Sequence, residues 1–330
     1  MINLGLLRGT KLALAVSGGG DSLALAYLFS AIENANAPVL IVDHGLQKDS
    51  AKHAKAAARR VKRAGLAHAI LTWKPPRGLK AGIEEAAREA RYRLMGAWCR
   101  THGIGALLTA HTLDDQAETF LLRLGRGSGV DGLSSMRAVT PLPVPGFEDI
   151  LLCRPLLGIA RAQLRAYLKT KNIPWHEDPM NSDPRFARVR VRALLPILEE
   201  AGLPVRRIAE AARHLARARE ALEAAAQSFL ERHSQTHAGM LVLNRTALLA
   251  APQEIALRVL VRSFALVTGE KRKPRFEPLE ALYRGLTEPA FQARTLAGCQ
   301  IRLSARARAP YGRESLEIRL APPRRQLKKP

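Results

Sequence analysis

The chain has 330 residues, of which 47% are hydrophobic, and its 52 Lys and Arg against 29 Asp and Glu give a formal net charge of +23. This length suits two domains, and the apolar fraction is ordinary for a globular protein, which excludes a disordered chain. The apolar runs are shorter than the roughly 20 residues of a membrane span and no secretory signal segment is visible, so we expect a cytoplasmic protein without membrane contact.

The N-terminal part of the chain alternates short apolar runs with longer helical patterns. The apolar runs predict strands at 12–16, 39–42, 69–73 and 106–109. The patterns after them predict helices at 21–34, 48–64, 83–102 and 114–124. This alternation is typical of an α/β fold with a doubly wound parallel sheet that helices cover on both faces. In such sheets, ligands bind beyond the carboxyl ends of the strands.

Further along the chain the pattern changes from alternating to mainly helical. A Pro-rich segment at 140–146 predicts an irregular loop, followed by a strand at 150–153 and helices at 161–171 and 205–232. The remaining segments predict a smaller α+β domain with strands at 240–244, 300–303 and 315–320 and helices at 252–267 and 277–286. We therefore expect a catalytic domain over 1–200, a helical connection over 201–235, a second domain over 236–321 and a basic tail over 322–330.

Positive charge is spread over both of these domains. Residues 201–330 alone carry 24 Lys and Arg against 11 Asp and Glu, a net charge of +13. Such a surplus favours a polyanionic partner, because each neutralised phosphate releases condensed counterions. A basic surface that serves only solubility is the alternative, and we favour nucleic acid.

A glycine-rich loop, Ser17-Gly18-Gly19-Gly20-Asp21-Ser22, lies directly between the first predicted strand and the first predicted helix. Three glycines let the backbone approach a ligand closely, and the amides of the first helical turn attract phosphate oxygens. The loop lacks the Gly-Lys-Ser/Thr of a Walker A motif, and its aspartate is better explained by a metal ion that bridges phosphates. The alternative is a glycine turn in which Asp21 or Ser22 is an ordinary helix N-cap.

Three acidic residues follow the fourth predicted strand, after His111. Asp114 and Glu118 stand four apart on one face of the predicted helix, and Asp115 is adjacent to Asp114. The cluster could hold Mg²⁺ or the ammonium group of a basic substrate, or it could complement the helix dipole. We favour a functional cluster because it lies at the same end of the sheet as the glycine-rich loop, with His111 as a contact near the nucleotide.

The glycine-rich loop resembles the signature of the N-type ATP pyrophosphatases (the PP-loop enzymes), which cleave ATP between the α and β phosphates. Four further motifs accompany it: Asp43-His44-Gly45-Leu46, Arg88 with Arg91-Tyr92, Arg154-Pro155-Leu156-Leu157, and the run from Asp178-Pro179-Met180-Asn181-Ser182-Asp183 to Arg192. Together, over residues 12–192, they resemble the bacterial tRNA(Ile)-lysidine synthetases. Met180 departs from that family, which commonly has a small polar residue there, and the region after 205 resembles the family only in position and helix content.

This resemblance implies a ligase that joins lysine to C2 of the wobble cytidine in an isoleucine tRNA with a CAU anticodon. The cytidine oxygen attacks the α-phosphate of ATP, and the lysine amine then displaces AMP. The residues from Ser17 to Ser22 would hold the leaving pyrophosphate, with Asp21 aiding a bound Mg²⁺. Asp114, Asp115 and Glu118 would bind lysine or metal, and one of them would help free the lysine amine of a proton.

Six arginines complete the predicted substrate site. Arg188, Arg190 and Arg192 alternate with apolar residues, so an extended segment would place all three guanidinium groups on one face. In a helix they would spread over the surface instead. The resemblance also assigns substrate contacts to Arg88, Arg91 and Arg154, although Arg88 and Arg91 are equally typical of a solvated helix face. The second domain would grip the tRNA body, and a homodimer is left open.

Two other functions compete with this one. A tRNA 2-thiolation enzyme of the same superfamily would need cysteines to carry sulfur or an iron–sulfur cluster, and Cys99, Cys153 and Cys299 have no such spacing. A non-catalytic RNA-binding protein with a nucleotide-responsive domain would be expected to lack the acidic residues, yet Asp21, Asp114 and Asp115 are present.

Overall fold

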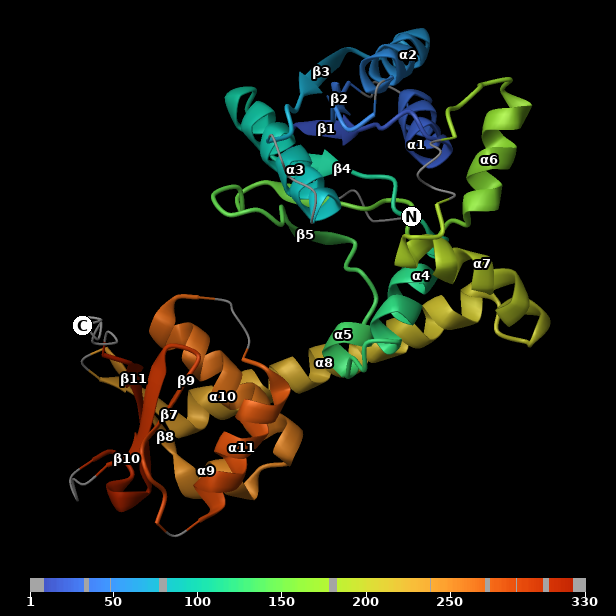
Figure 1. The fold of residues 1–330 in the computed structure, drawn as a ribbon. Coiled ribbons are helices and arrows are strands. Elements are labelled where there is room, and N and C mark those ends of the chain that lie inside the picture. The colour runs from blue at the N-terminus through green and yellow to red at the C-terminus, as the bar shows by residue number, and fades with distance from the viewer. Residues whose placement is uncertain are drawn as a thin grey trace, which may run out of the picture. The chain divides into compact units, whose positions relative to one another are not determined.

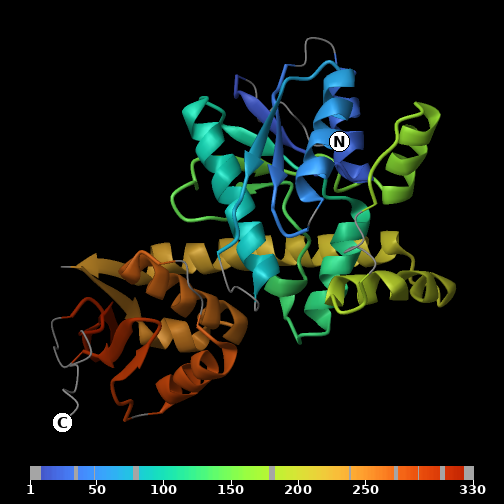
Figure 2. The same ribbon diagram turned by 45° about the horizontal axis from the view of Figure 1, so that its top comes forward.

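A computed structural model describes residues 9–32, 36–47, 49–76, 82–177, 183–237, 239–270, 274–288, 290–304 and 309–322. The chain divides into two compact units, Met1–Ala216 and Arg217–Pro330 (Figure 1). The boundary falls inside one helix, α8 (Val205–His233), which Figure 2 shows as a continuous ribbon. None of the helices in the described ranges is long and apolar enough to cross a membrane.

The first unit is built on a six-stranded sheet in the order β3-β2-β1-β4-β6-β5. Its parallel strands are β1 (Leu12–Ala15), β2 (Val39–Asp43), β3 (His68–Thr72), β4 (Ala106–Leu108) and β6 (Leu151–Cys153). The sixth strand, β5 (Val139–Pro141), pairs with β6 in the antiparallel direction. The expectation of an irregular loop from residue 140 was therefore wrong at its start, since Pro141 is tolerated at the end of an edge strand.

Helices cover both faces of this sheet, as predicted for a doubly wound fold. Successive residues of the inner strands alternate between two cores: Leu14 and Leu108 belong to one, and Ala13 and Leu107 to the other. The first core is completed by α1 (Gly20–Ser30), α2 (Ser50–Arg63) and α6 (Arg161–Thr170), and the second by α3 (Ile83–Thr101) (Figure 1).

Three further helices extend the first unit beyond the sheet. They are α4 (Leu113–Leu124), α5 (Val130–Leu133) and α7 (Ala187–Glu200). Helix α7 packs against α4, with Ala117 and Leu195 in a small apolar cluster. The extended conformation expected around Arg188–Arg192 was thus wrong, because this segment is the first part of a helix that packs on α4 through Leu195 and Leu198.

The second unit is a five-stranded antiparallel sheet with helices packed on it. The strands are β7 (Ser234–His237), β8 (Met240–Asn244), β9 (Arg294–Leu296), β10 (Cys299–Leu303) and β11 (Ser315–Leu320), in the order β7-β8-β11-β10-β9. The helices are α9 (Arg245–Ala250), α10 (Gln253–Thr268) and α11 (Phe276–Thr287), with a 3-10 turn at Gly312–Glu314. Phe264, Ile301 and Ile318 are almost fully buried in its own core. The predicted tail lies, from residue 323 on, outside the described residues.

Candidate active site

A cavity of about 440 Å³ opens at the carboxyl end of the parallel sheet. Its walls come from the β1–α1 loop, α2, α3, the β4–α4 turn, α6 and α7. The predicted site residues that line it are Ser17, Gly19, Gly20, Asp21, Ser22, Arg88, Arg91, His111, Asp115, Arg188 and Arg192. The cavity thus brings residues from the glycine-rich loop, the acidic cluster and the arginine run into one place.

The glycine-rich loop keeps its shape through hydrogen bonds between neighbouring residues. The Ser22 hydroxyl donates to the Gly19 carbonyl at 3.0 Å, and the Ser17 amide donates to Ser22 Oγ at 3.2 Å. Gly18 has a φ of +91°, and a Cβ there would lie 3.0 Å from the Ala57 Cβ of α2. The N-cap of α1 is Gly19, so the alternative in which Asp21 or Ser22 caps the helix is wrong. The amides of the first turn therefore remain available to an anion.

Trp175 and His176 pack against this loop, and the sequence did not predict either of them as a site residue. The His176 amide donates to the Gly18 carbonyl at 3.1 Å, and the Trp175 indole lies where a Cβ on Gly20 would be only 3.4 Å away. The His53 and His176 rings contact one another at a tilt of 33° with centroids 3.9 Å apart, and both line the cavity. The adjoining predicted run Asp178–Ser182 lies outside the described residues.

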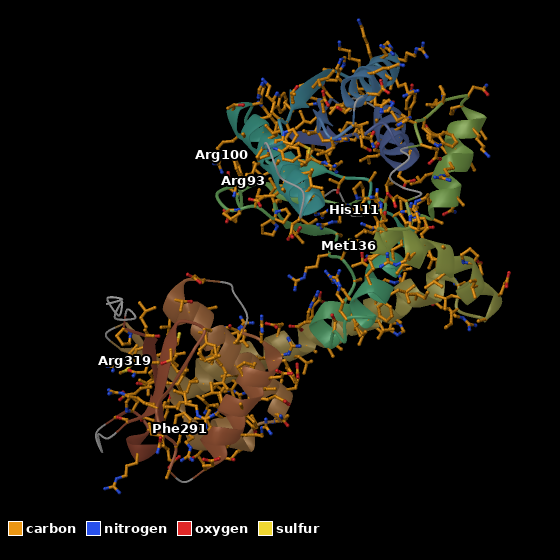
Figure 3. All side chains as sticks on the ribbon, viewed as in Figure 1. Arg93, Arg100, His111, Met136, Phe291 and Arg319 are labelled. Carbon is orange, nitrogen blue, oxygen red and sulfur yellow. The ribbon has the colours of Figure 1, made fainter. Side chains whose placement is uncertain are left out.

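The β4–α4 turn fixes Asp115 by a capping box. Asp115 Oδ2 accepts from the Thr112 amide and from the Thr112 hydroxyl, both at 2.8 Å, and the Asp115 amide donates to Thr112 Oγ1. This use of Oδ2 leaves Oδ1 turned toward the arginines of α6 and α7. In the same turn His111 (labelled in Figure 3) hydrogen-bonds through Nδ1 to Thr109 Oγ1 at 3.0 Å. Burial lowers the pKa of His111 to about 4, so the ring is neutral at physiological pH.

Six charged side chains form what we call the arginine–carboxylate cluster: Asp21, Asp115, Glu118, Arg161, Arg188 and Arg192. Arg161 lies at its centre and reaches all three carboxylates. Its Nε donates to Asp21 Oδ2 at 3.0 Å, its Nη1 to Glu118 Oε1 at 3.0 Å, and its Nη2 to Asp115 Oδ1 at 3.3 Å. Three positive and three negative charges balance one another, as partly buried ions require.

Glu118 is fully buried and forms ion pairs with all three arginines of this cluster. Arg188 Nε donates to its Oε2 at 2.7 Å, and Arg192 Nε donates to its Oε1 at 2.9 Å. Burial alone would raise the pKa of Glu118, but the arginines outweigh burial and hold that pKa below its usual range. The same balance lowers the pKa of Asp115, whereas burial raises the pKa of Asp21 despite Arg161.

Four of the predicted site residues lie away from the cavity surface, in addition to Gly18. Asp114 accepts from the backbone amide of Arg161 at 2.8 Å, so it holds the start of α6. Arg154 is buried and donates to the Arg137 carbonyl at 2.8 Å, which ties it to the strand pair β5–β6. Arg190 points to the opposite side of α7 and donates to backbone carbonyls. Glu118, as described, lies behind the arginines.

Arg88 and Arg91 reach the cavity from α3. Both line it, and the Arg88 guanidinium lies 5.2 Å from the centre of the buried Tyr92 ring. Arg161 is the central residue that sequence reasoning missed. In the sequence it is a single basic residue at the start of a predicted helix, and nothing there distinguishes it from a surface arginine.

Comparisons with known proteins show which family this chain resembles. Residues 4–198 match the model of a PP-loop domain family. A tRNA(Ile)-lysidine synthase of Methylobacterium nodulans is 41% identical over 322 residues, covering 94% of this chain and 91% of the relative. A second such enzyme, from a Bradyrhizobium species, is 37% identical and covers 96% and 91%. Among solved structures, the U34-tRNA thiolase NcsA from Methanococcus maripaludis superposes with a TM-score of 0.51 at 19% identity, over 63% of this chain and 72% of that one; this likeness concerns the fold alone.

Proposed function

The chain belongs to the tRNA(Ile)-lysidine synthase family of PP-loop enzymes, and from this membership we propose how its cavity carries out the reaction. The enzyme uses ATP to join lysine to C2 of the wobble cytidine of tRNA(Ile), with release of AMP and pyrophosphate. One observation carries the proposal: the phosphate-binding loop and the arginine–carboxylate cluster share a single cavity, and Asp21 belongs to both.

In the first half of the reaction the cytidine is adenylated, and the negatively charged pyrophosphate leaves at the glycine-rich loop. The uncapped amides at the start of α1, with Ser17 and Ser22, bind the phosphates that leave as pyrophosphate. Arg188 and Arg192 lie on the cavity wall one helical turn apart and can bind the α-phosphate or the base oxygen beside it. The cytidine must leave its stack to reach this place, and an anticodon loop presents it unpaired.

Magnesium fits this site through Asp21. Its Oδ1 is buried and has no hydrogen-bond partner among the described residues, whereas its Oδ2 is held by Arg161. No group of three His, Cys, Asp or Glu that could hold a metal ion occurs within the described ranges, which suits an ion that one carboxylate and the substrate phosphates hold together. Bound Mg²⁺ would offset the charge that develops on the phosphates.

Lysine is the nucleophile of the second half, and Asp115 is the carboxylate best placed to receive it. It lines the cavity and its pKa is lowered, so it is ionised at neutral pH and can attract an ammonium group. Glu118 is less suited to this role, because it is fully buried and does not line the cavity. Exclusion of water around the bound amine would favour its neutral, nucleophilic form.

The second unit is proposed to bind the tRNA body. Its chain segment carries much of the net positive charge, and backbone contacts of this kind add affinity without reading bases. The observed affinity for tRNA should therefore fall steeply with salt, while affinity for ATP falls much less. Equal salt sensitivity of the two would contradict this assignment.

The thiolation alternative is disfavoured by the cysteines. Cys99, Cys153 and Cys299 are all buried and lie in three different cores. Burial raises the pKa of Cys99 to about 12, so this thiol is a poor sulfur carrier.

The deciding experiment incubates the full chain with ATP, Mg²⁺, radiolabelled lysine and tRNA(Ile) transcripts. We expect label in the transcript with a CAU anticodon and none in a matched transcript with UAU. Absence of lysine incorporation, together with sulfur incorporation when a sulfur donor is supplied, would overturn the assignment.

A further inference from the structure

Arg161 makes an unusual set of contacts for one side chain. It is the first residue of α6, its side chain is 12% exposed, and each of its three guanidinium nitrogens donates to a different carboxylate. Those carboxylates belong to two elements, α1 and α4. Arg188 is its natural comparison, because it contacts Asp115 at 2.9 Å and Glu118 at 2.7 Å, with no ion pair to Asp21.

The contact with Asp21 leaves the two oxygens of that carboxylate in different situations. Oδ2 accepts from Arg161 Nε at 3.0 Å, and Oδ1 is buried without a hydrogen-bond partner in the part of the chain that the structure describes. The terminal torsion of an aspartate is soft and roughly two-fold, so a free Asp21 would present either oxygen in several orientations. A hydrogen bond to one oxygen removes that freedom, as the outer partners of metal-ligating carboxylates commonly do.

We propose that Arg161 is a positioning residue that orients Asp21, so that Oδ1 is directed to the metal ion bound with ATP. This inference rests on the proposed function only for the presence of that ion. A buried oxygen without a partner among the described residues costs free energy, and a divalent cation bound beside Asp21 would offset that cost. Arg161 also neutralises Asp115 and Glu118 from the same position, which keeps the carboxylates from repelling one another.

A purely neutralising role is the competing explanation. It predicts that loss of Arg161 and loss of Arg188 have the same effect on metal binding, since each removes one positive charge from the same two carboxylates. The positioning role predicts a difference, because Arg188 makes no ion pair with Asp21. The two variants R161Q and R188Q are therefore a matched pair.

The test measures Mn²⁺ binding by electron paramagnetic resonance in the full-length protein saturated with an ATP analogue that has a methylene between the α and β phosphates. We expect R161Q to bind Mn²⁺ about 10- to 100-fold more weakly than the wild type, which is the usual cost of losing such an outer partner. We expect R188Q to weaken Mn²⁺ binding clearly less than R161Q does, because it leaves the Asp21 hydrogen bond intact, and R161K, which keeps the charge but not the fork geometry, to fall between R161Q and the wild type.

Equal weakening in R161Q and R188Q, or unchanged binding in R161Q and R161K, would overturn the positioning role. Thermal unfolding shows whether each variant is folded, and R161K supplies the answer if R161Q is not. D21N is the reference for loss of the ligand itself. If D21N binds Mn²⁺ like the wild type, this inference fails, while lysine incorporation by the unmodified protein still decides the proposed function separately.

Discussion

The glycine-rich loop and the arginine–carboxylate cluster border the same cavity but are held together in opposite ways. The side-chain hydrogen bonds within the loop join residues no more than five positions apart, such as Ser17 to Ser22, and a backbone bond from the distant His176 to Gly18 adds to them. The cluster joins residues distant in the chain, with Arg161 bonded to Asp21 across 140 positions and to Glu118 across 43. A site for phosphates can therefore be local, whereas a site for a charged nucleophile depends on the whole unit being folded.

The two regions also differ in how many formal charges they bury. Backbone amides and hydroxyls attract an anion without burying a formal charge. The cluster removes three arginines and three carboxylates from much of the solvent, which is tolerable only while every charge keeps its partners. Substitutions in the loop should therefore affect catalysis more than folding, and substitutions in the cluster should affect both.

Asp21 is the one residue that belongs to both regions, so Asp21→Asn should have the largest effect. We expect lysine transfer to fall on the order of 10³-fold, equivalent to about 4 kcal/mol of transition-state stabilisation, because the metal ligand is lost. The amide can still accept from Arg161, so the unfolding transition should move little. Retained transfer, or a protein that no longer folds, would break the distinction drawn between the loop and the cluster.

Glu118→Ala tests the cluster. It leaves Arg161, Arg188 and Arg192 short of a buried partner, and we expect the first unit to lose about 3–5 kcal/mol of unfolding free energy. Chemical denaturation followed by circular dichroism measures this loss. Glu89→Ala is the control, because its ion pair with Arg93 is exposed and should contribute little. Equal effects of the two changes would mean that Glu118 is not the anchor of the cluster.

Gly18→Ala tests the loop. Its φ of +91° disfavours a side chain, and the new Cβ would lie 3.0 Å from Ala57. We expect a loss of about 2 kcal/mol of unfolding free energy. Gly19→Ala is the matched control, because no positive φ occurs there and the nearest atom would be 3.7 Å away. The loop would be less constrained than described if both variants were equally stable.

The pH dependence of stability tests whether the buried His111 ring is neutral in the folded protein, unlike the charged side chains of the cluster. Its pKa of about 4 lies below the usual 6.5, so on acidification the unfolded chain takes up a proton before the folded chain does. Stability is therefore lost as pH falls below 6.5, by about 0.8 kcal/mol at pH 6 from this residue. His111→Gln should remove that part of the pH dependence when unfolding is compared at pH 8 and pH 6. Identical pH dependence in both proteins would mean that folding does not lower the pKa of His111.

The strands and helices that form the two cores were largely predictable, because burial imposes a regular apolar pattern. The doubly wound α/β fold is confirmed. The strands β5, β7 and β9 were not predicted, since each has only three or four residues and is too short to show that pattern. Helix α7 was misjudged because Arg188, Arg190 and Arg192 alternate like a strand, and only packing on α4 decides between the two periods.

Site residues whose partners are distant in the sequence could not be predicted. Local order sufficed to place Ser17–Ser22 and Asp115 at the carboxyl ends of strands. Nothing local to Arg161 or His176 distinguishes them from surface residues, because their partners are supplied by α1, α2 and α4. Glu118 was correctly grouped with Asp115, but its burial behind the arginines depends on the position of α7.

The contact of Trp175 with Gly20 has a practical consequence for spectroscopy. An indole packed on the phosphate-binding loop is a built-in fluorescent reporter, since binding of a polyanion beside it changes the polarity around the ring. With Trp73 and Trp98 replaced by phenylalanine, emission from Trp175 alone would follow the filling and emptying of the loop in real time, without any attached dye.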